Sequence, residues 1–264
     1  MDRHIRTIDD VLQLMDGLFA PESDRWTAGA ADWWDGFYAD RSRPVPFFVA
    51  KPDEHLASAL DRGLIAPGRA LELGCGPGRN ALHLASLGFE VDAVDLSPAA
   101  LAWAGERAAD AGLDVRFHHG DIFDPDPAAW SGPYDLILDS GCFHHLPPHR
   151  RISYLALLER SLAPGGHFSL TCFAAGEAGM GSELPDAEFY GESRLHGGLA
   201  YTAESLRALF ADLTEVELRR MNDEPPESPR FGEGFLWAGL FRRPPAGGAP
   251  GAGGRRAQGV RCHH

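Results

Sequence analysis

Three glycines at alternate positions are the residues in this chain best placed to do chemistry. Gly74, Gly76 and Gly78 follow the apolar run 71–73 and precede a run from Asn80 whose apolar spacing is helical. Glycine accepts positive φ angles and has no Cβ, so such a loop brings bare backbone close to a ligand. The stretch therefore predicts a strand, a tight ligand-binding loop and the start of a helix.

A carboxylate at the end of the next predicted strand supports a nucleoside ligand. Asp95 closes the apolar run 89–95, seventeen residues after Gly78. A carboxylate in this position can accept both hydroxyls of a ribose. Arg79 stands where a dinucleotide-binding loop needs a third small residue, and no Gly-Lys-Ser/Thr follows the loop. The pattern thus disfavours both NAD and a nucleoside triphosphate.

These residues resemble the motif of the class I S-adenosylmethionine-dependent methyltransferases, whose first strand ends in Glu/Asp-x-Gly-x-Gly-x-Gly. Glu72 and the three glycines match it. The resemblance implies S-adenosylmethionine as cofactor, with the acid after the third strand on the adenine amino group and the next residue packed on the ring. The cofactor-binding residues that it implies are Glu72, Gly74, Cys75, Gly76, Gly78, Asn80, Asp95, Leu96, Asp121, Ile122, Asp139 and Ser140.

Alternating strand and helix patterns extend this resemblance over residues 55–243. Alternation of this kind implies parallel strands with helical crossovers. We expect a Rossmann-like, doubly wound, seven-stranded α/β sheet with helices on both faces and an N-terminal aromatic helical arm. Strands are predicted at 70–75, 89–95, 114–119, 134–139, 166–173, 214–221 and 235–242, and helices at 8–19, 53–65, 79–87, 98–111, 148–162 and 202–210.

The predicted organisation has three parts. Residues 1–54 form a helical, aromatic-rich lid, and residues 55–243 form the methyltransferase domain, with a Gly-rich substrate insertion at 174–198. Residues 244–264 are a Gly/Pro-rich tail whose composition predicts disorder. For the aromatic segment two interpretations are open, a hydrophobic arm docked on the core and a lid over the pocket, and the two are compatible.

Two adjacent histidines after the fourth predicted strand are the candidate catalytic residues. His144 and His145 follow Asp139 and Ser140 at the carboxyl end of that strand. Imidazole titrates near neutral pH and can take a proton from a methyl acceptor. The alternative is that one histidine caps the next helix and the other lies on the surface. A thiol acceptor needs little help from a base, because thiolate forms near neutral pH.

The acceptor pocket is predicted between the aromatic arm and the insertion. A long loop in a compact domain is usually functional or disordered. The mixture of aromatic and polar side chains implies a partly apolar substrate. The candidate substrate-binding residues are Trp34, Tyr38, Arg43, Phe173, Tyr190 and His196.

Composition limits the partners. The net charge of −14 repels nucleic acid and anionic membranes, so a small-molecule acceptor is expected and neither of those partners is. Four cysteines without a Cys-x-x-Cys pair indicate neither a zinc site nor a disulfide framework, and no metal is expected. The chain lacks an apolar signal segment or a run of transmembrane length, which favours a cytoplasmic monomer or homodimer.

The sequence thus predicts a methyltransferase of small molecules. We favour S-methylation of a thiol in a natural product or xenobiotic, as part of secondary metabolism. O- or N-methylation of a secondary metabolite is the alternative. A protein that binds S-adenosylmethionine without catalysis is a second alternative, and it would not need an arm and an insertion that meet at the sulfonium.

Overall fold

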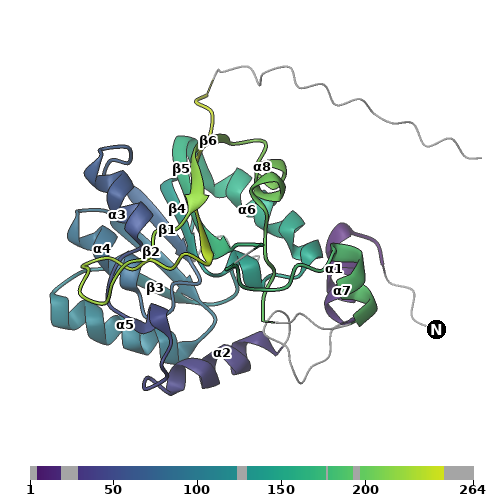
Figure 1. The fold of residues 1–264 in the computed structure, drawn as a ribbon, viewed down its shortest axis with the longest axis horizontal. Coiled ribbons are helices and arrows are strands. Elements are labelled where there is room, and N and C mark those ends of the chain that lie inside the picture. Colours follow the sequence, from purple (N-terminus) through teal and green to yellow (C-terminus); the bar gives the residue numbers. More distant parts are fainter. Residues whose placement is uncertain (1–4, 19–28, 124–129, 177, 193–196, 247–264) are drawn as a thin grey trace, which may run out of the picture.

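The computed structural model describes residues 5–18, 29–123, 130–176, 178–192 and 197–246 of the 264-residue chain. Within these residues, seven strands form one sheet in the order β3-β2-β1-β4-β5-β7-β6 (Figure 1). Neighbours from β3 to β5 are parallel, and β7 is antiparallel to both β5 and β6. The strands are β1 (Arg69–Leu73), β2 (Glu90–Asp95), β3 (Arg116–His119), β4 (Tyr134–Ser140), β5 (Leu162–Phe173), β6 (Thr214–Arg220) and β7 (Leu236–Arg242).

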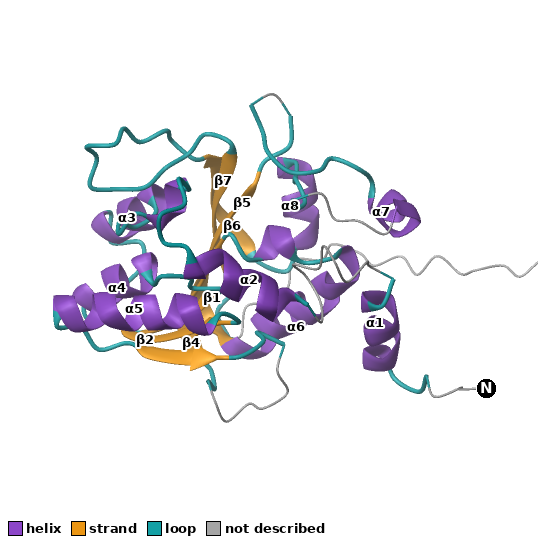
Figure 2. Ribbon diagram, turned by 90° about the horizontal axis from the view of Figure 1, so that it is seen from below, coloured by secondary structure: helices purple, strands orange, loops and turns teal. Residues whose placement is uncertain are grey.

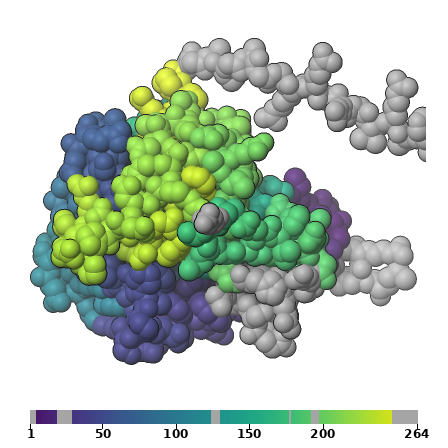
Figure 3. Space-filling model, in the orientation of Figure 1, coloured from purple at the N-terminus to yellow at the C-terminus, as the bar shows by residue number. Residues whose placement is uncertain are grey.

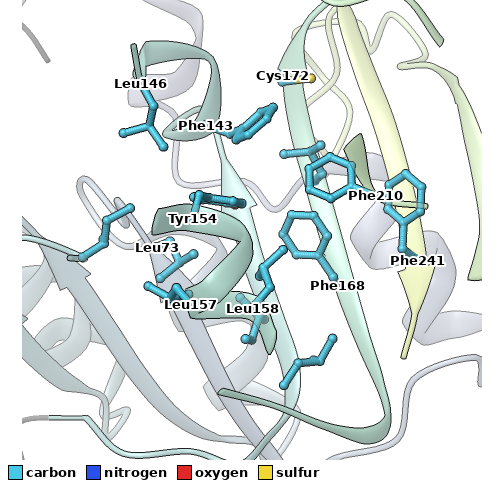
Figure 4. Close-up of a cluster of buried hydrophobic side chains, with 14 of the residues drawn as sticks. Leu73, Phe143, Leu146, Tyr154, Leu157, Leu158, Phe168, Cys172, Phe210 and Phe241 are labelled. Carbon is cyan, nitrogen blue, oxygen red and sulfur yellow. The ribbon is translucent and has the colours of Figure 1, made fainter. Parts of the chain in front are cut away.

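Helices cover both faces of this sheet (Figure 2). Because side chains alternate along a strand, Leu136 and Leu138 of β4 pack under α3 and α4, whereas Ile137 packs under α6 and α8. Figure 4 shows the apolar cluster under α6 and α8, which includes Phe143, Tyr154 and Phe168. The helices are α1 (Ile8–Asp16), α2 (Ala30–Ala39), α3 (Glu54–Asp61), α4 (Arg79–Ser86), α5 (Pro98–Ala111), α6 (Arg151–Ser161), α7 (Asp186–Glu192) and α8 (Ala203–Leu209), with 3₁₀ turns η2 (Pro46–Phe48), η3 (Phe143–His145) and η4 (Pro148–Arg150).

The architecture confirms the expected Rossmann-like, doubly wound sheet. Each predicted strand is present, and α5 has the predicted bounds because Ser97 caps its first turn and Gly112, at φ 63°, ends it. Strand β5 begins at Leu162, earlier than the Pro-Gly-Gly sequence suggests. Helix α2 lies in the predicted aromatic helical arm, for which no bounds of a second helix are predicted, and α7 lies in the insertion, for which no helix is predicted.

Two chain segments lie over the carboxyl ends of the strands. Helix α2 crosses this end of the sheet (Figures 1 and 2). The loop between β6 and β7 reaches the N-terminal region, where Phe231 N–H donates to the Pro52 carbonyl at 2.8 Å and Glu54 N–H donates to the Phe231 carbonyl at 2.8 Å. In Figure 3 this yellow-green loop lies directly beside the dark-blue N-terminal residues. Among the helices of the described ranges, none is long and apolar enough to cross a membrane.

Candidate active site

A cavity of about 1350 Å³ lies beyond the carboxyl ends of β1 to β5. The strand order reverses between β1 and β4, which is where open α/β sheets bind ligands. Pockets for a single small ligand commonly enclose about 300–1,000 Å³, so this cavity has room for two molecules. The predicted residues that line it are Trp34, Tyr38, Gly74, Asp95, Leu96, Asp121, Ile122, Ser140, His144, His145 and Phe173.

Asp95 is held at the end of β2 by two backbone donors. Its Oδ2 accepts the Gly76 N–H at 2.7 Å, and its Oδ1 accepts the Ser97 N–H at 2.9 Å. Burial raises the pKa of Asp95, and these N–H groups oppose the rise. A carboxylate oxygen can accept more than one hydrogen bond, so Asp95 can still receive ribose hydroxyls. This donor set fits the nucleoside part of S-adenosylmethionine.

The turn after β3 supplies a second polar group on the same wall. Asp121 Oδ1 accepts the Phe123 N–H at 2.9 Å, which fixes the turn that presents Ile122. Both residues line the cavity together with Leu96 and Ser140. An acid beside an apolar side chain suits a flat polar ring such as adenine.

Gly74 is a position where only glycine fits. Its φ is 64°, and a Cβ built there would lie 2.8 Å from the Cβ of Cys142. The residue lines the cavity through its backbone. Gly74 is therefore the glycine of the loop whose backbone a ligand in the cavity could approach.

Five other residues predicted to bind the cofactor lie behind the cavity wall. Cys75 belongs to the apolar cluster under α4, and a Cβ at Gly78 would lie 3.1 Å from the Ala104 Cβ, so both serve packing. Asn80 Oδ1 accepts the Asp53 N–H at 2.8 Å. Glu72 is buried, which raises its pKa to about 8, and Gly76 faces Tyr38. These residues support the loop and are not among those that line the cavity.

Asp139 also supports the site from behind. It is fully buried and accepts the Cys142 N–H at 2.9 Å, the Phe143 N–H at 3.1 Å and the Tyr154 hydroxyl at 2.8 Å. Burial raises its pKa to about 6, while these donors favour the ionised form. Asp139 is not among the residues that line the cavity, because its carboxylate is occupied in orienting η3.

The two histidines of η3 both line the cavity but differ in their chemistry. His144 is buried and stacks on Phe173 with ring centroids 3.7 Å apart. Its Nδ1 accepts the Phe173 N–H at 3.3 Å, so the ring proton lies on Nε2. Burial, with a smaller contribution from His145, lowers the pKa of His144 well below its usual value. His144 is therefore a neutral hydrogen-bond donor and a poor general base, and His145 is the better candidate for that role.

The aromatic arm closes one side of the cavity. Trp34 packs edge to face on His145 with centroids 4.9 Å apart, and Tyr38 is buried against the glycine loop. Arg43 does not line the cavity, contrary to the prediction. Its guanidinium lies over the outer face of Phe37 and 3.9 Å from Asp40, where it stays in water.

The Gly76–Tyr38 contact gives a test of this packing. Gly76 has φ 50°, and a Cβ there would lie 2.8 Å from the Tyr38 hydroxyl. We expect Gly76→Ala to lower the free energy of unfolding by about 2–3 kcal/mol, from backbone strain and this clash. Gly88→Ala is the matched control, because Gly88 has φ 86° and nothing within 4 Å of the added Cβ. Gly76→Ala should therefore cost more stability than Gly88→Ala, and this difference should be smaller in a Tyr38→Phe background. If denaturant melts show the same difference in both backgrounds, the contact with the Tyr38 hydroxyl is contradicted.

The insertion contributes less than predicted. Met180, Gly181 and Gly197 of the insertion line the cavity. Phe173, which also lines it, is the last residue of β5, and Leu199, whose N–H donates to the His144 carbonyl at 2.7 Å, follows the insertion. Tyr190 does not line it, because its hydroxyl contacts the backbone N and Nδ1 of His149, both at 3.0 Å. His196 lies outside the described residues.

Arg79 is a cavity residue that the sequence did not reveal. Its guanidinium lies 2.6 Å from Asp53, donates to Ser140 Oγ at 2.8 Å and lies over the Phe231 ring at 4.3 Å. Burial acts to raise the pKa of Asp53, but Arg79 and His55 outweigh it, and the pKa is lowered. The sequence shows an arginine directly after the glycine loop, but its partner Asp53 lies in a different segment of the chain, so the pair could not be predicted.

Comparisons with known proteins agree with this site. Residues 70–166 match the family model described as a methyltransferase domain. This stretch of the chain is therefore similar to a methyltransferase domain. Within the described residues no group of three or more His, Cys, Asp or Glu side chains could hold a metal ion.

Relatives of this domain include named methyltransferases. The chain is 31% identical over 133 residues to a 2-heptyl-1-hydroxyquinolin-4(1H)-one methyltransferase of Mycobacteroides abscessus, over 50% of this chain and 57% of that protein. The chain therefore spans just over half the length of this curated relative. The match agrees with the enzyme class that the sequence predicts.

Two solved structures share the fold. The one described as "Conversion of a Disulfide Bond into a Thioacetal Group during Echinomycin Biosynthesis" is 26% identical with a TM-score of 0.61, over 81% of this chain and 93% of that one. The 1,6-didemethyltoxoflavin-N1-methyltransferase of Burkholderia thailandensis is 22% identical with a TM-score of 0.53, over 92% and 93%. The description of the latter structure names bound 1,6-didemethyltoxoflavin and S-adenosylhomocysteine.

Proposed function

We propose that this chain is an S-adenosylmethionine-dependent methyltransferase that acts on a small molecule. The observation that carries the proposal is a single cavity with two kinds of wall. Asp95 and Asp121 mark the polar wall at the ends of β2 and β3, and Trp34 and Phe173 mark the aromatic wall. A nucleoside on the first wall and an acceptor on the second would meet at η3.

The chain's own residues would bind and orient both partners. When bound, S-adenosylmethionine supplies a methyl group on a positively charged sulfur, so the protein must mainly position, desolvate and deprotonate the acceptor. Asp95 would hold the ribose and Asp121 with Ile122 the adenine. Ser140 and the backbone of Gly74 would hold the methionine part. We further propose that residues 1–54 act as the lid and that 55–243 form the catalytic domain. Residues 247–264 of the predicted tail lie outside the described residues.

We infer a sulfur acceptor. For the methyl group to be transferred, the acceptor would have to give up its proton, and a group beside the acceptor would have to take that proton. Among the described residues beside Trp34 and Phe173, the histidines of η3 are the groups able to take that proton, and His144 is a poor base. A thiol suits such a site, because thiolate forms near neutral pH. The description of the echinomycin structure names disulfide conversion to a thioacetal.

O-methylation is the second candidate. The relative from Mycobacteroides abscessus is named for a hydroxyquinolone substrate. A hydroxyl acceptor would depend more on His145 as a general base, because phenols ionise near pH 10.

A matched set of acceptors separates the two candidates. 2-Naphthalenethiol, 2-naphthol and 2-naphthylamine have the same ring and differ only in the nucleophile. We expect methylation of the thiol to exceed that of the naphthol and the amine at least tenfold in kcat/KM, measured by methylated product. Faster methylation of naphthol would replace the sulfur assignment by oxygen.

His145→Ala tests the base. We expect kcat to fall about 100-fold for 2-naphthol and less for the thiol, because general-base catalysis typically contributes about 10²–10⁴-fold. Affinity for S-adenosylhomocysteine should change little, since His145 follows the strand end that would hold the cofactor. Wild-type turnover of naphthol would remove His145 from catalysis.

A further inference from the structure

A continuous row of rings crosses the acceptor side of the cavity. Trp34, His145, His144, Phe173 and Phe235 form it, and all five line the cavity. Successive ring centroids are 4.9, 4.3, 3.7 and 6.4 Å apart. We call these five residues the aromatic ridge. They come from α2, η3, β5 and the residue before β7, so four separate segments build one surface.

The ridge contains no carboxylate or guanidinium. Among the described residues, the charged side chains that line the cavity are Asp16, Arg79, Asp95, Asp121 and Arg150. Both arginines are already neutralised, Arg79 by Asp53 at 2.6 Å and Arg150 by Asp16. Asp95 and Asp121 belong to the proposed nucleoside wall. A charged acceptor lying on the ridge would therefore lose its water without gaining a counter-ion, which is costly.

The shape and chemistry of the ridge favour flat ligands. Aromatic pairs prefer stacked or edge-to-face contacts, and these add to the effect of buried area. The backbone of η3 is fixed by Asp139 and Leu199. The Phe173 N–H donates to the His144 ring, and the His145 ring packs against Trp34 and His144. A preorganised surface binds without the cost of ordering its side chains.

We propose that the methyl acceptor is a flat, fused-ring aromatic molecule that lies on the aromatic ridge and carries no charged group apart from its reacting atom. This inference rests on the proposed methyltransferase function. It adds a substrate class that neither the cofactor assignment nor the choice of sulfur or oxygen requires.

Binding to protein saturated with S-adenosylhomocysteine tests the inference independently of turnover. The probes are 2-naphthol, decahydro-2-naphthol and 6-hydroxy-2-naphthoate, which compare a flat ring, a puckered ring of the same skeleton and a charged flat ring. We expect 2-naphthol to bind at least tenfold more tightly than the other two in calorimetric titrations. Equal or tighter binding of the puckered or the charged compound would overturn the inference. Failure of S-adenosylhomocysteine itself to bind would instead overturn the proposed function.

Substitutions in the aromatic ridge test which residues cause the preference for the flat ring. Phe173→Leu and Trp34→Leu keep an apolar side chain but remove a ring, so the preference for 2-naphthol over decahydro-2-naphthol should fall at least threefold in each. Trp103→Leu is the matched control, because Trp103 packs beneath η2 and does not line the cavity. Its preference should remain that of the wild type. An unchanged preference in both ridge variants, with S-adenosylhomocysteine affinity retained, would contradict stacking on the ridge.

Discussion

Asp95→Ala is expected to weaken S-adenosylhomocysteine binding about 100-fold or more. The carboxylate would accept two ribose hydroxyls, and hydrogen bonds to charged groups contribute about 1.5–3 kcal/mol each. It also fixes the glycine loop through the Gly76 N–H at 2.7 Å. The binding free energy lost with the ligand contacts and the loop anchor together therefore exceeds the roughly 2.7 kcal/mol that corresponds to a 100-fold change in affinity.

Calorimetric titration checks this value, with Glu90→Ala as control. Glu90 is exposed at the first residue of the same strand, so its removal should leave binding unchanged. Circular dichroism should show that the Asp95 variant keeps its fold. Affinity within threefold of wild type in a folded Asp95→Ala protein would refute the ribose assignment.

Glu72→Gln is expected to change how stability depends on pH. Glu72 is fully buried beneath the glycine loop, its Oε2 makes no hydrogen bond within the described residues, and burial raises its pKa to about 8. The folded protein therefore keeps this proton after the unfolded chain, with its pKa of 4.5, has lost it. The free energy of unfolding consequently falls as pH rises from 4.5 toward 8 and then levels off.

Glutamine mimics the protonated side chain at every pH, so the variant should lack this loss. The stability of Glu72→Gln relative to wild type should rise by on the order of 3–4 kcal/mol between about pH 5 and pH 8.5, at 1.36 kcal/mol per pH unit. Urea melts of both proteins at the two pH values give this difference. The comparison cancels other titrating groups such as Asp139, whose pKa is raised to about 6. Parallel pH profiles for the two proteins would show that Glu72 is ionised when buried.

Most of the fold could be predicted because local signals agree with it. Ser97-Pro98 begins α5 and Gly112 ends it, and the apolar runs mark the strands. The aromatic arm was predicted to be helical, but the bounds of α2 could not be predicted, because this helix contains Trp33, Trp34 and Gly36 and has no side-chain N-cap. Helix α7 lies in a Gly-rich segment whose composition favours loops.

The site was predictable where residues follow strand ends directly. Asp95, Asp121 and Ser140 line the cavity because parallel strands end at one edge of the sheet. Phe235 and Arg79 were missed, because their positions depend on contacts with residues far away in the sequence. Arg79 is oriented by Asp53 in the segment before α3, and no local pattern links the two.

The errors have a common origin. Asp139 and Tyr190 are polar residues in segments that reach the cavity. The Asp139 carboxylate and the Tyr190 hydroxyl each accept a backbone N–H and therefore do not point into it. Sequence position places a residue near a site but does not give the direction of its side chain. The direction depends on which unpaired backbone donors lie within reach, and the need to satisfy them is strong inside a protein.

The most direct test of the account is calorimetric titration of the wild-type protein with S-adenosylhomocysteine, with NAD as control in the same preparation. We predict saturable binding of S-adenosylhomocysteine at one site per chain, with a Kd in the micromolar range or below, and no heat of binding with NAD. Binding of NAD without S-adenosylhomocysteine, or binding of neither, would contradict the assignment of the cavity to a methyltransferase.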